Sequence, residues 1–423
     1  MMNDSILIAR EKRFEYITEL SKTYPSIIVL KANTPGPDKN RYSSFFLIDQ
    51  FNRIIESKFQ FDFKTLKKGF DGPYYVYAFS TILSKDTKLE LIDIENTNML
   101  GRLIDIDLYI NAKMISRSNF EIDLRGCMIC NHSAIDCMRN KRHSVEEILN
   151  HIDARILYYL NLSIGPIIKS AMYDELNLDD KFGLVTPTSS GSHTDMDYAI
   201  MIKSIDILNP YFLDMFELGF KFEDEKILFQ KARIIGINAE RDMLNNSNGI
   251  NTYKGLIYIL GFVLLALGYI VKHNKPFDSI FSRIKDLSKD VLNDFKNDIN
   301  SAGVNAYKNY QIKGIRGEVH DGLPTVQNAL NYFEKLDSSN PINFHHILLY
   351  FIMHSQDTIL LKRSKTLDRY LQIKAMSKQV DPYNEKDIKD FTAYCIKNHI
   401  SFGGSADLFI VFQFLNKIKL FLK

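Results

Sequence analysis

This 423-residue sequence has no large excess of positive or negative charge. Its 53 Lys and Arg residues are nearly balanced by 51 Asp and Glu residues, which gives a formal net charge of +2. This balance gives no reason to expect a nucleic-acid partner or binding to an anionic membrane surface. The N-terminus lacks the basic, apolar and small-residue order of a signal peptide, so we expect a cytoplasmic protein. Low-complexity linkers and internal repeats are also missing, and the length suggests two domains.

Cysteine is scarce, and its placement argues against a disulfide framework. Cys127, Cys130 and Cys137, three of the four cysteines, lie within one short segment. In a reducing compartment such a group predicts free thiols or a metal site. His143 could complete a four-ligand Zn²⁺ site, although the spacings differ from those of a common zinc finger, and buried thiols are the alternative. In either case we expect a structural role and not a catalytic one.

Long apolar runs are scarce too, with one clear case from residue 255 to residue 271. As a helix this run is apolar on every side, so it must be enclosed by other elements or by lipid. It lies at the short limit for crossing a bilayer and has a single Lys at each end, which favours a buried core helix. Asn251 and Lys254 precede it, where free backbone N–H groups and the helix dipole attract anions.

The most informative stretch of the first part of the chain is a strand with strict alternation, from Gly101 to Ile110. Apolar side chains fall on one face of this strand, and Asp105 and Asp107 fall together on the other. Two carboxylates on one strand face can share Mg²⁺ and bring a triphosphate to a nucleophile, and a solvated strand edge is the alternative. Arg117, at the end of a second short strand, could add positive charge beside the phosphates.

Beyond Ser144 helical periodicity repeats and alternating strands almost disappear, so we place a domain boundary near residue 145 and expect an all-α domain after it. Polar, glycine-rich segments interrupt the predicted helices at their ends. In the first of them, Asp195 and Asp197 can converge on one metal ion only if Asp195 still lies in the loop. The alternative is that both acids complement the dipole of the helix that follows.

Three further polar segments stand at predicted helix starts, and they hold Arg316, Glu318, Asp357, Ser405 and Asp407. Ser405 is a natural N-cap, and the start of its helix is another anion site. Because several such helix starts occur in one helical domain, the sequence predicts a shared polar cleft.

Several motifs of residues 1 to 145 occur in the order found in a known enzyme family: Asn33 to Lys39, Gly101 to Asp107, Ile115 to Arg117, Arg125 to Cys130 and Cys137 to His143. In these motifs the sequence resembles the citrate lyase acyl-carrier-protein phosphoribosyl-dephospho-CoA transferases. The resemblance implies attachment of a prosthetic group to a serine of the acyl carrier protein subunit of citrate lyase, with release of pyrophosphate. It also implies an α+β domain with a nucleotidyltransferase-like mixed sheet, catalytic and metal-binding roles for Asp105 and Asp107, and contacts to phosphates from Lys39, Arg102 and Arg117.

A second set of motifs covers residues 191 to 197, 236 to 240, 249 to 255, 314 to 318, 357 to 358 and 403 to 407. In these motifs residues 145 to 423 resemble the triphosphoribosyl-dephospho-CoA synthases, which implies an enzyme that joins ATP to 3'-dephospho-CoA and releases adenine. Three departures are visible. Tyr253 stands where a His is expected, Phe402 stands where a Pro is expected, and the segment from Ile359 to Lys365 keeps Arg363 but lacks the expected glycines.

The implied reaction is a substitution at the anomeric carbon of ribose, with a transition state of oxocarbenium character. It needs metal-bound acids for the triphosphate, cations for the phosphate charge and a carboxylate near the attacking hydroxyl. We expect Glu318 to be the base, with Mg²⁺ (or Mn²⁺) at Asp195, Asp197, Asp357 and Asp407. The residues expected to contact the substrate are His193, Asn251, Lys254, Arg316 and Ser405.

We therefore expect a bifunctional transferase in which residues 146–423 make the prosthetic group and residues 1–145 attach it. Two alternatives stay open at this point. One is a single metal-dependent nucleotide-processing activity in the helical domain, beside a carrier-protein docking module. The other is a non-catalytic, membrane-associated binding protein in which residues 255 to 271 form an anchor.

Overall fold

The computed structural model describes residues 2–123, 125–222, 224–293, 302–336, 340 and 342–422. The chain divides into two compact units, Met1–Asn161 and Leu162–Lys423, which we call unit 1 and unit 2. Helix α5 (Val145–Leu176) begins at the position where we expect the domain boundary, and the division between the compact units falls inside this helix. The boundary near residue 145 stays a prediction for the functional domains.

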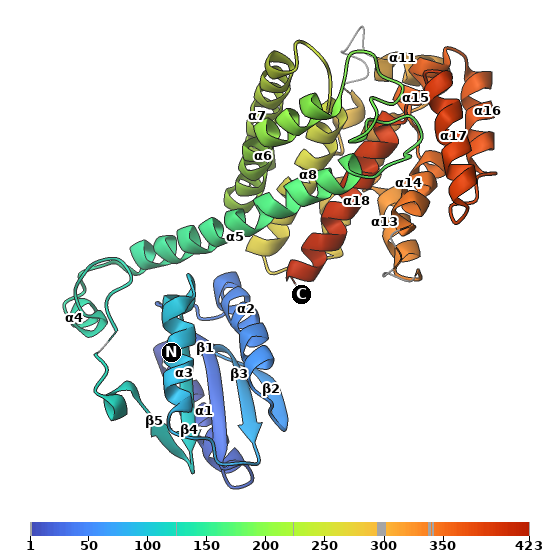
Figure 1. Ribbon diagram of the computed structural model, residues 1–423. Helices are drawn as coiled ribbons and strands as arrows, with labels where there is room; N and C mark the ends of the chain where they lie inside the picture. Colours follow the sequence, from blue (N-terminus) through green and yellow to red (C-terminus); the bar gives the residue numbers. More distant parts are fainter. Residues whose placement is uncertain are drawn as a thin grey trace. The chain divides into compact units, whose positions relative to one another are not determined.

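Unit 1 is an α/β unit whose helices alternate with strands (Figure 1). Its elements are α1 (Met2–Leu20), β1 (Ser26–Ala32), α2 (Tyr42–Lys58), β2 (Phe63–Gly69), β3 (Gly72–Phe79), α3 (Thr87–Thr97), β4 (Ile104–Ile110), β5 (Lys113–Ile115) and α4 (Ala134–Arg139), with short 3₁₀ helices at Gly101–Leu103 and Arg117–Phe120.

The sheet of unit 1 has the strand order β2-β3-β1-β4-β5, and its described pairs are antiparallel. The α+β class is confirmed, but the sheet is antiparallel where we expected a mixed one. Helices α2 and α3 do connect strands that run in the same direction, β1 to β2 and β3 to β4. An oppositely directed strand lies between the members of each pair, so adjacent strands alternate in direction.

Strand alternation decides which side chains of the sheet share a face. Val29 of β1 pairs with Val76 of β3, and both pack in one apolar cluster with Ile17 of α1. In the register of β1 with β4, Val29 is opposite Asp107 and Lys31 is opposite Asp105. Because residues opposite each other across a ladder point to the same side, the two carboxylates lie on the α1 face of the sheet.

Unit 2 is helical throughout its described regular elements (Figure 1), so the predicted all-α second part is confirmed. After α5 the helices are α6 (Tyr198–Lys221), α7 (Glu225–Asn246), α8 (Lys254–Lys272), α9 (Ser279–Leu287), α11 (Ala302–Tyr310), α12 (Gly314–His320), α13 (Pro324–Phe333), α14 (Asn343–His354), α15 (Thr358–Ser364), α16 (Leu367–Ser377), α17 (Glu385–Lys397) and α18 (Gly403–Leu422), with a 3₁₀ turn at Val291–Asn293.

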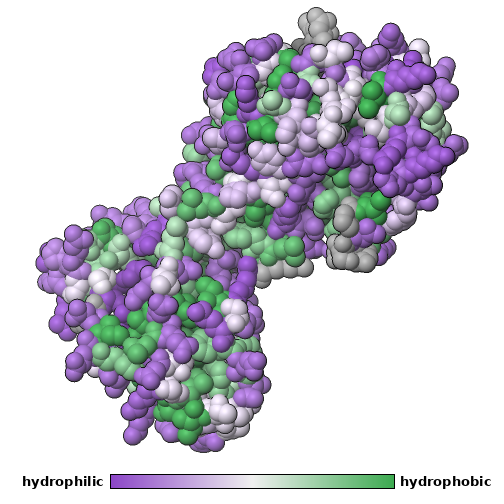
Figure 2. All heavy atoms as spheres, viewed as in Figure 1, coloured by the Kyte–Doolittle hydropathy of each residue, from purple (hydrophilic) through white to green (hydrophobic). Residues whose placement is uncertain are grey.

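Helix α8 is the central helix of unit 2 and contains the apolar run. It packs against α6, α7, α9, α12 and α18, and its crossing with α6 is close enough that a Cβ on Gly219 would collide with the carbonyl oxygen of Leu265. Among the described helices α8 alone is long and apolar enough to cross a membrane, and 72% of its apolar window is buried inside the molecule. The predicted core helix is therefore confirmed, and hydrophilic residues cover much of the face of unit 2 that Figure 2 shows.

Candidate active sites

The carboxylates of Asp105 and Asp107 converge on one point at the α1 face of unit 1. The Lys31 ammonium group lies there, with Nζ 3.0 Å from Asp105 Oδ2 and 2.9 Å from Asp107 Oδ2. Burial alone would raise the pKa of Asp105, but Lys31 and then Arg125 outweigh burial and lower it. The same two carboxylates raise the pKa of Lys31 in spite of its burial. The predicted pair thus converges on the Lys31 ammonium group, and its role in binding a metal ion stays a prediction.

Next to this pair, three arginines line a cavity of about 260 Å³. Arg117 and Arg125 both pair with the buried Glu95, and Arg125 also lies 3.4 Å from Asp105 Oδ1. Arg102 Nε donates to the Gly126 carbonyl at 3.0 Å, whereas its buried Nη1 has no hydrogen-bond partner among the described residues. Guanidinium groups arranged in this way suit phosphate oxygens.

Sequence reasoning placed Arg102 and Arg117 in this region but missed Lys31, Glu95 and Arg125. Lys31 could have been found only from the strand register, which puts it opposite Asp105. Lys39 lies elsewhere in unit 1, where its Nζ donates to the Thr34 carbonyl, and it is not among the residues that line the arginine cavity. Burial, and then the charge of Arg10, lower the pKa of Lys39.

The cysteine segment of unit 1 forms a compact Cys₃His cluster. Cys130 Sγ lies 3.3 Å from Cys137 Sγ and 3.2 Å from His143 Nε2, and with Cys127 the four ligand atoms lie within 4.8 Å of one another. A tetrahedral Zn²⁺ site with Zn–S bonds of about 2.3 Å places its sulfur atoms about 3.8 Å apart. The geometry of the cluster therefore suits a structural zinc ion.

In unit 2 the ends of the predicted polar segments meet around a cavity of about 490 Å³. His193, Asn251, Lys254, Arg316 and Asp407 are the predicted site residues that line it. They come from the loop before α6, the start of α8, the start of α12 and the start of α18. The predicted shared cleft thus brings together segments that are more than 200 residues apart in the chain, since both His193 and Asp407 line it.

The acidic part of this cavity is formed by Asp407 and Glu175. Glu175 is buried and pairs with the buried Lys181 at 2.7 Å. Asp407 lies against Gly255, at the first turn of α8, where it accepts a hydrogen bond from the backbone of Leu256. Burial, followed by the charges of Asp357 and Glu175, raises the pKa of Asp407 well above its usual value. Burial therefore favours the protonated form of Asp407 over the ionised form.

The cationic part is formed by Lys254, Lys313, Arg316 and Lys362. Lys254 is held by Glu240 of α7, a residue of the motif at 236 to 240. Asn251 accepts a hydrogen bond at 3.0 Å from the backbone N–H of Lys254, the first residue of α8. The positive charges of these side chains would compensate the negative charge of triphosphate oxygens.

His193 is held on both ring nitrogens. Its Nδ1 lies 3.1 Å from Arg363 Nη2, and its Nε2 lies 3.0 Å from Ser401 Oγ. Burial, followed by the charge of Arg363, lowers the pKa of His193 to about 4. The imidazole is therefore neutral near pH 7.

The remaining predicted residues of unit 2 do not line the cavity. Asp357 is buried beneath it and holds Ser405 through both the backbone N–H and the hydroxyl, at 2.8 and 2.9 Å. Glu318 accepts hydrogen bonds from Thr325 at the start of α13, and burial raises its pKa.

Asp195 and Asp197 are exposed, and Asp197 caps α6 by accepting from the Ile200 N–H at 2.9 Å. Among the described residues, no three of the four acids predicted as metal ligands come together as one ion-binding group. The donor set expected for a metal in unit 2 therefore does not fit a single ion in this geometry. The metal-binding roles of these acids stay predictions.

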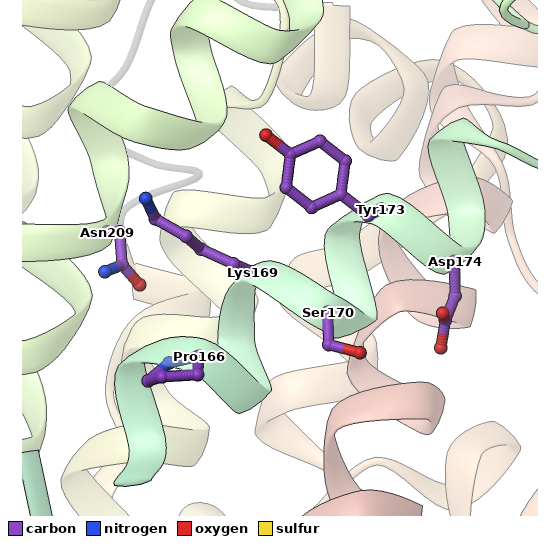
Figure 3. Close-up of a pocket in the computed structure, with 6 residues that line it drawn as sticks. All are labelled: Pro166, Lys169, Ser170, Tyr173, Asp174 and Asn209. Carbon is purple, nitrogen blue, oxygen red and sulfur yellow. The ribbon is translucent and has the colours of Figure 1, made fainter. Parts of the chain in front are cut away.

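A second cavity of unit 2, of about 570 Å³, lies between α5 and α6 (Figure 3). It is lined by Pro166, Lys169, Ser170, Tyr173, Asp174 and Asn209, and none of these residues was predicted at a site. Its charges are neutralised in pairs, because Lys169 lies 2.7 Å from Asp206 and Asp174 lies 2.9 Å from Lys417. The cavity that collects the predicted residues is the better candidate for chemistry, although it is the smaller one.

Comparison with known protein families divides the chain into the same two parts as the structure. Residues 161–422 match the family model described as ATP:dephospho-CoA triphosphoribosyl transferase. The chain belongs to this family. Residues 2–159 match the model described as apo-citrate lyase phosphoribosyl-dephospho-CoA transferase, so the chain is a bifunctional transferase with the two activities in the predicted order.

Relatives of this bifunctional transferase cover one or both parts. Protein CitXG of Leuconostoc mesenteroides subsp. cremoris is 29% identical, over 98% of this chain and 96% of the relative. Protein CitXG of Haemophilus influenzae is 26% identical, over 96% and 94%. The 2-(5''-triphosphoribosyl)-3'-dephosphocoenzyme-A synthase of Haemophilus ducreyi is 30% identical, over 66% of this chain and 96% of the relative. The two family resemblances and the transferase function are thus confirmed.

Proposed function

We propose that residues 146–423 make 2'-(5''-triphosphoribosyl)-3'-dephospho-CoA from ATP and 3'-dephospho-CoA, and that residues 1–145 transfer it to a serine of the citrate lyase acyl carrier protein. Two separate cavities, each lined by cations and carboxylates, support this division. A cytoplasmic location is part of the proposal, and it agrees with the four free cysteines.

In unit 1 the transferred phosphoryl group would lie beside Asp105 and Asp107, with its phosphates at Arg102, Arg117 and Arg125. In the reaction the serine oxygen bonds to the phosphorus, the bond from phosphorus to pyrophosphate breaks, and the serine proton leaves to solvent or a base. Mg²⁺ or Mn²⁺ held by Asp105 and Asp107 would supply compensation for the charge of the triphosphate. The convergence of both carboxylates on Lys31 is the observation that carries this assignment.

The test of this assignment separates the two activities in one protein. Asp105→Asn should reduce pyrophosphate release with the carrier protein by at least about 100-fold, because one of two charged ligands is lost. Adenine release from ATP and dephospho-CoA should stay within about twofold of the wild-type rate, within the usual scatter of a distant substitution. Asp93→Asn, at an exposed carboxylate of α3, is the matched control. Equal loss of both activities in a folded Asp105→Asn protein would contradict the assignment.

In unit 2 we place the triphosphate at Lys254 and Arg316 and the reacting ribose near Asp407. The bond from ribose C1 to adenine breaks, a ribosyl hydroxyl of dephospho-CoA bonds to C1, and its proton must be removed while adenine gains one. Asp407 is the candidate proton donor to adenine, because burial raises its pKa well above the usual value. Glu175, which lines the cavity, is a better placed acceptor for the hydroxyl proton than Glu318. Incubation with ATP, dephospho-CoA and Mg²⁺ should yield adenine, and Asp407→Asn should abolish it.

For the Cys₃His cluster we propose a structural Zn²⁺ ion held by Cys127, Cys130, Cys137 and His143. Metal analysis of protein purified without chelator should give one zinc per chain, and Cys130→Ser should lose it. Cys395→Ser, at the buried cysteine outside the cluster, is the control and should keep the zinc. Metal-free wild-type protein with the same thermal stability would contradict the proposal.

A further inference from the structure

The strongest unassigned feature of the unit 2 cavity is a chain of three side chains, Arg363, His193 and Ser401. Arg363 belongs to α15, His193 to the loop before α6, and Ser401 to the turn before α18. His193 and Ser401 line the cavity, and Ser401 is 1% exposed. Arg363 also donates to the Ser192 carbonyl at 3.2 Å, which fixes the guanidinium group beside the imidazole ring.

The chemistry of these groups decides the direction of both hydrogen bonds. A guanidinium group can only donate, so Arg363 Nη2 donates to His193 Nδ1. Nδ1 must accept this bond through its lone pair and therefore carries no proton, so the ring proton lies on Nε2, which donates to Ser401 Oγ. The Ser401 hydroxyl accepts at its oxygen and has its own proton left to donate. Among the described residues no acceptor takes that proton.

We propose that Ser401 donates a hydrogen bond to a phosphate oxygen of the triphosphate, and that His193 and Arg363 are positioning residues that fix the polarity of this hydroxyl. The inference rests on the proposed function, since it takes ATP as the substrate of the cavity. Its direction is the reverse of a serine nucleophile, because a His193 that donates to Ser401 cannot remove the serine proton. An anionic acceptor is favoured for two reasons. The positive charge of Arg363 polarises the hydrogen bonds from Arg363 through His193 to Ser401, and Lys362 lines the same cavity.

Two further groups near Ser401 suit the same anion. Gly403 and Gly404 form the first turn of α18 and line the cavity. A Cβ at Gly404 would lie 3.1 Å from Asp357 Oδ1, so a larger residue at this position would crowd the buried carboxylate. The first N–H groups of a helix have no partner within the helix and bind phosphate readily.

Binding of inorganic triphosphate, measured by calorimetry on the full chain, tests the proposal without turnover. Ser401→Ala should raise the Kd for inorganic triphosphate and for ATP by about 10-fold, as expected for one lost hydrogen bond to a charged group, and leave the Kd for adenosine unchanged. Arg363→Met should raise these Kd values by a similar factor, and Arg363→Lys by a smaller one. The double variant with Ser401→Ala and Arg363→Met should bind triphosphate no more weakly than Ser401→Ala alone, because both substitutions act through one hydrogen bond. Arg369→Met, on the neighbouring helix α16, is the matched control.

The position of the imidazole proton supplies a second readout that altered packing would not mimic. Nitrogen NMR of histidine-labelled wild-type protein should show the Nε2–H form of His193, and Arg363→Met should lose this preference. Unchanged triphosphate binding in Ser401→Ala, a loss that appears with adenosine, or an Nδ1–H form in the wild type would each overturn the proposal. Adenine release by the wild type tests the proposed function separately, so the two can fail independently.

Discussion

Asp357→Asn separates a structural role of this carboxylate from the metal-binding role predicted for it. Oδ1 of Asp357 accepts from the backbone N–H groups of Ile359 and Leu360 at 2.9 and 3.0 Å, and Oδ2 accepts from Ser405 at 2.8 and 2.9 Å. An asparagine can supply an acceptor to only one of these two sides. The other side then meets an NH₂ group, and a buried N–H loses its acceptor.

The magnitude follows from what is lost. One buried backbone donor without a partner costs about 1–3 kcal/mol, and the charge-assisted bonds that remain become weaker. Relief from burying a charge offsets part of this, so we expect the free energy of unfolding to fall by about 2–4 kcal/mol. Urea unfolding of the full chain, followed by circular dichroism, measures it. Asp195→Asn is the matched control, because this acid is exposed, and its effect should stay within about 0.5 kcal/mol.

A metal ligand would behave differently. Asp357→Asn would then leave the free energy of unfolding unchanged and raise the Mg²⁺ concentration needed for half-maximal adenine release. That pair of results would refute the structural reasoning and restore Asp357 as a metal ligand.

Two other perturbations follow from the same cavity. The pKa of His193 is about 4 in the folded chain and about 6.5 in the unfolded chain, so the folded state binds fewer protons between these two pH values. The neutral imidazole therefore contributes its full share of the folding stability above pH 6.5, and this share is lost as the pH falls toward 4. This loss of stability has an upper limit of about 3 kcal/mol before solvent screening. Measurements of the free energy of unfolding at about pH 7.5 and about pH 5 test it, and the decrease between the two should be smaller in His193→Gln than in the wild type. An equal decrease in the variant would contradict this. Gly255→Ala should abolish adenine release, because the new Cβ would collide with the Asp407 carboxyl group. Gly261→Ala, in the same helix, should retain it, because its new Cβ would meet only ordinary van der Waals contacts with Met215 at 3.7 Å or more. Full activity of Gly255→Ala would show that Asp407 is free to move.

The part of unit 1 that could be predicted from the sequence depends on short-range periodicity. Alternation from Ile104 to Ile110 is enough to put Asp105 and Asp107 on one face, and the structure has them there. The direction of neighbouring strands is not contained in such a pattern, so the antiparallel order and the contact with Lys31 could not be predicted. Arg125 lies in a segment without regular structure, where its direction depends on tertiary contacts with Glu95.

In unit 2 the sequence predicted that the polar segments would meet, but it did not predict the role of each acidic residue. Asp197 and Asp357 stand at the starts of α6 and α15, and Glu318 of α12 faces the start of α13. At a helix start a carboxylate can either cap backbone N–H groups or point into a cleft. Sequence spacing is the same in both cases. The choice depends on elements far along the chain, as with Ser405, 48 residues after Asp357. For that reason the positions of these residues were easier to predict than their contacts.

The two cavities differ in a way that matches the two chemistries. Phosphoryl transfer needs charge compensation around phosphorus more than proton donation. Unit 1 places Lys31 and Arg125 beside its carboxylate pair and lines the neighbouring cavity with three arginines. Release of adenine needs a proton on the leaving base as well as cations for the triphosphate. Unit 2 lines one cavity with lysines and with Asp407, the proposed proton donor, whose pKa burial raises well above its usual value. A raised pKa favours the neutral carboxyl group, which can lie close to a triphosphate without repelling it, whereas an ionised one could do so only with a cation between them.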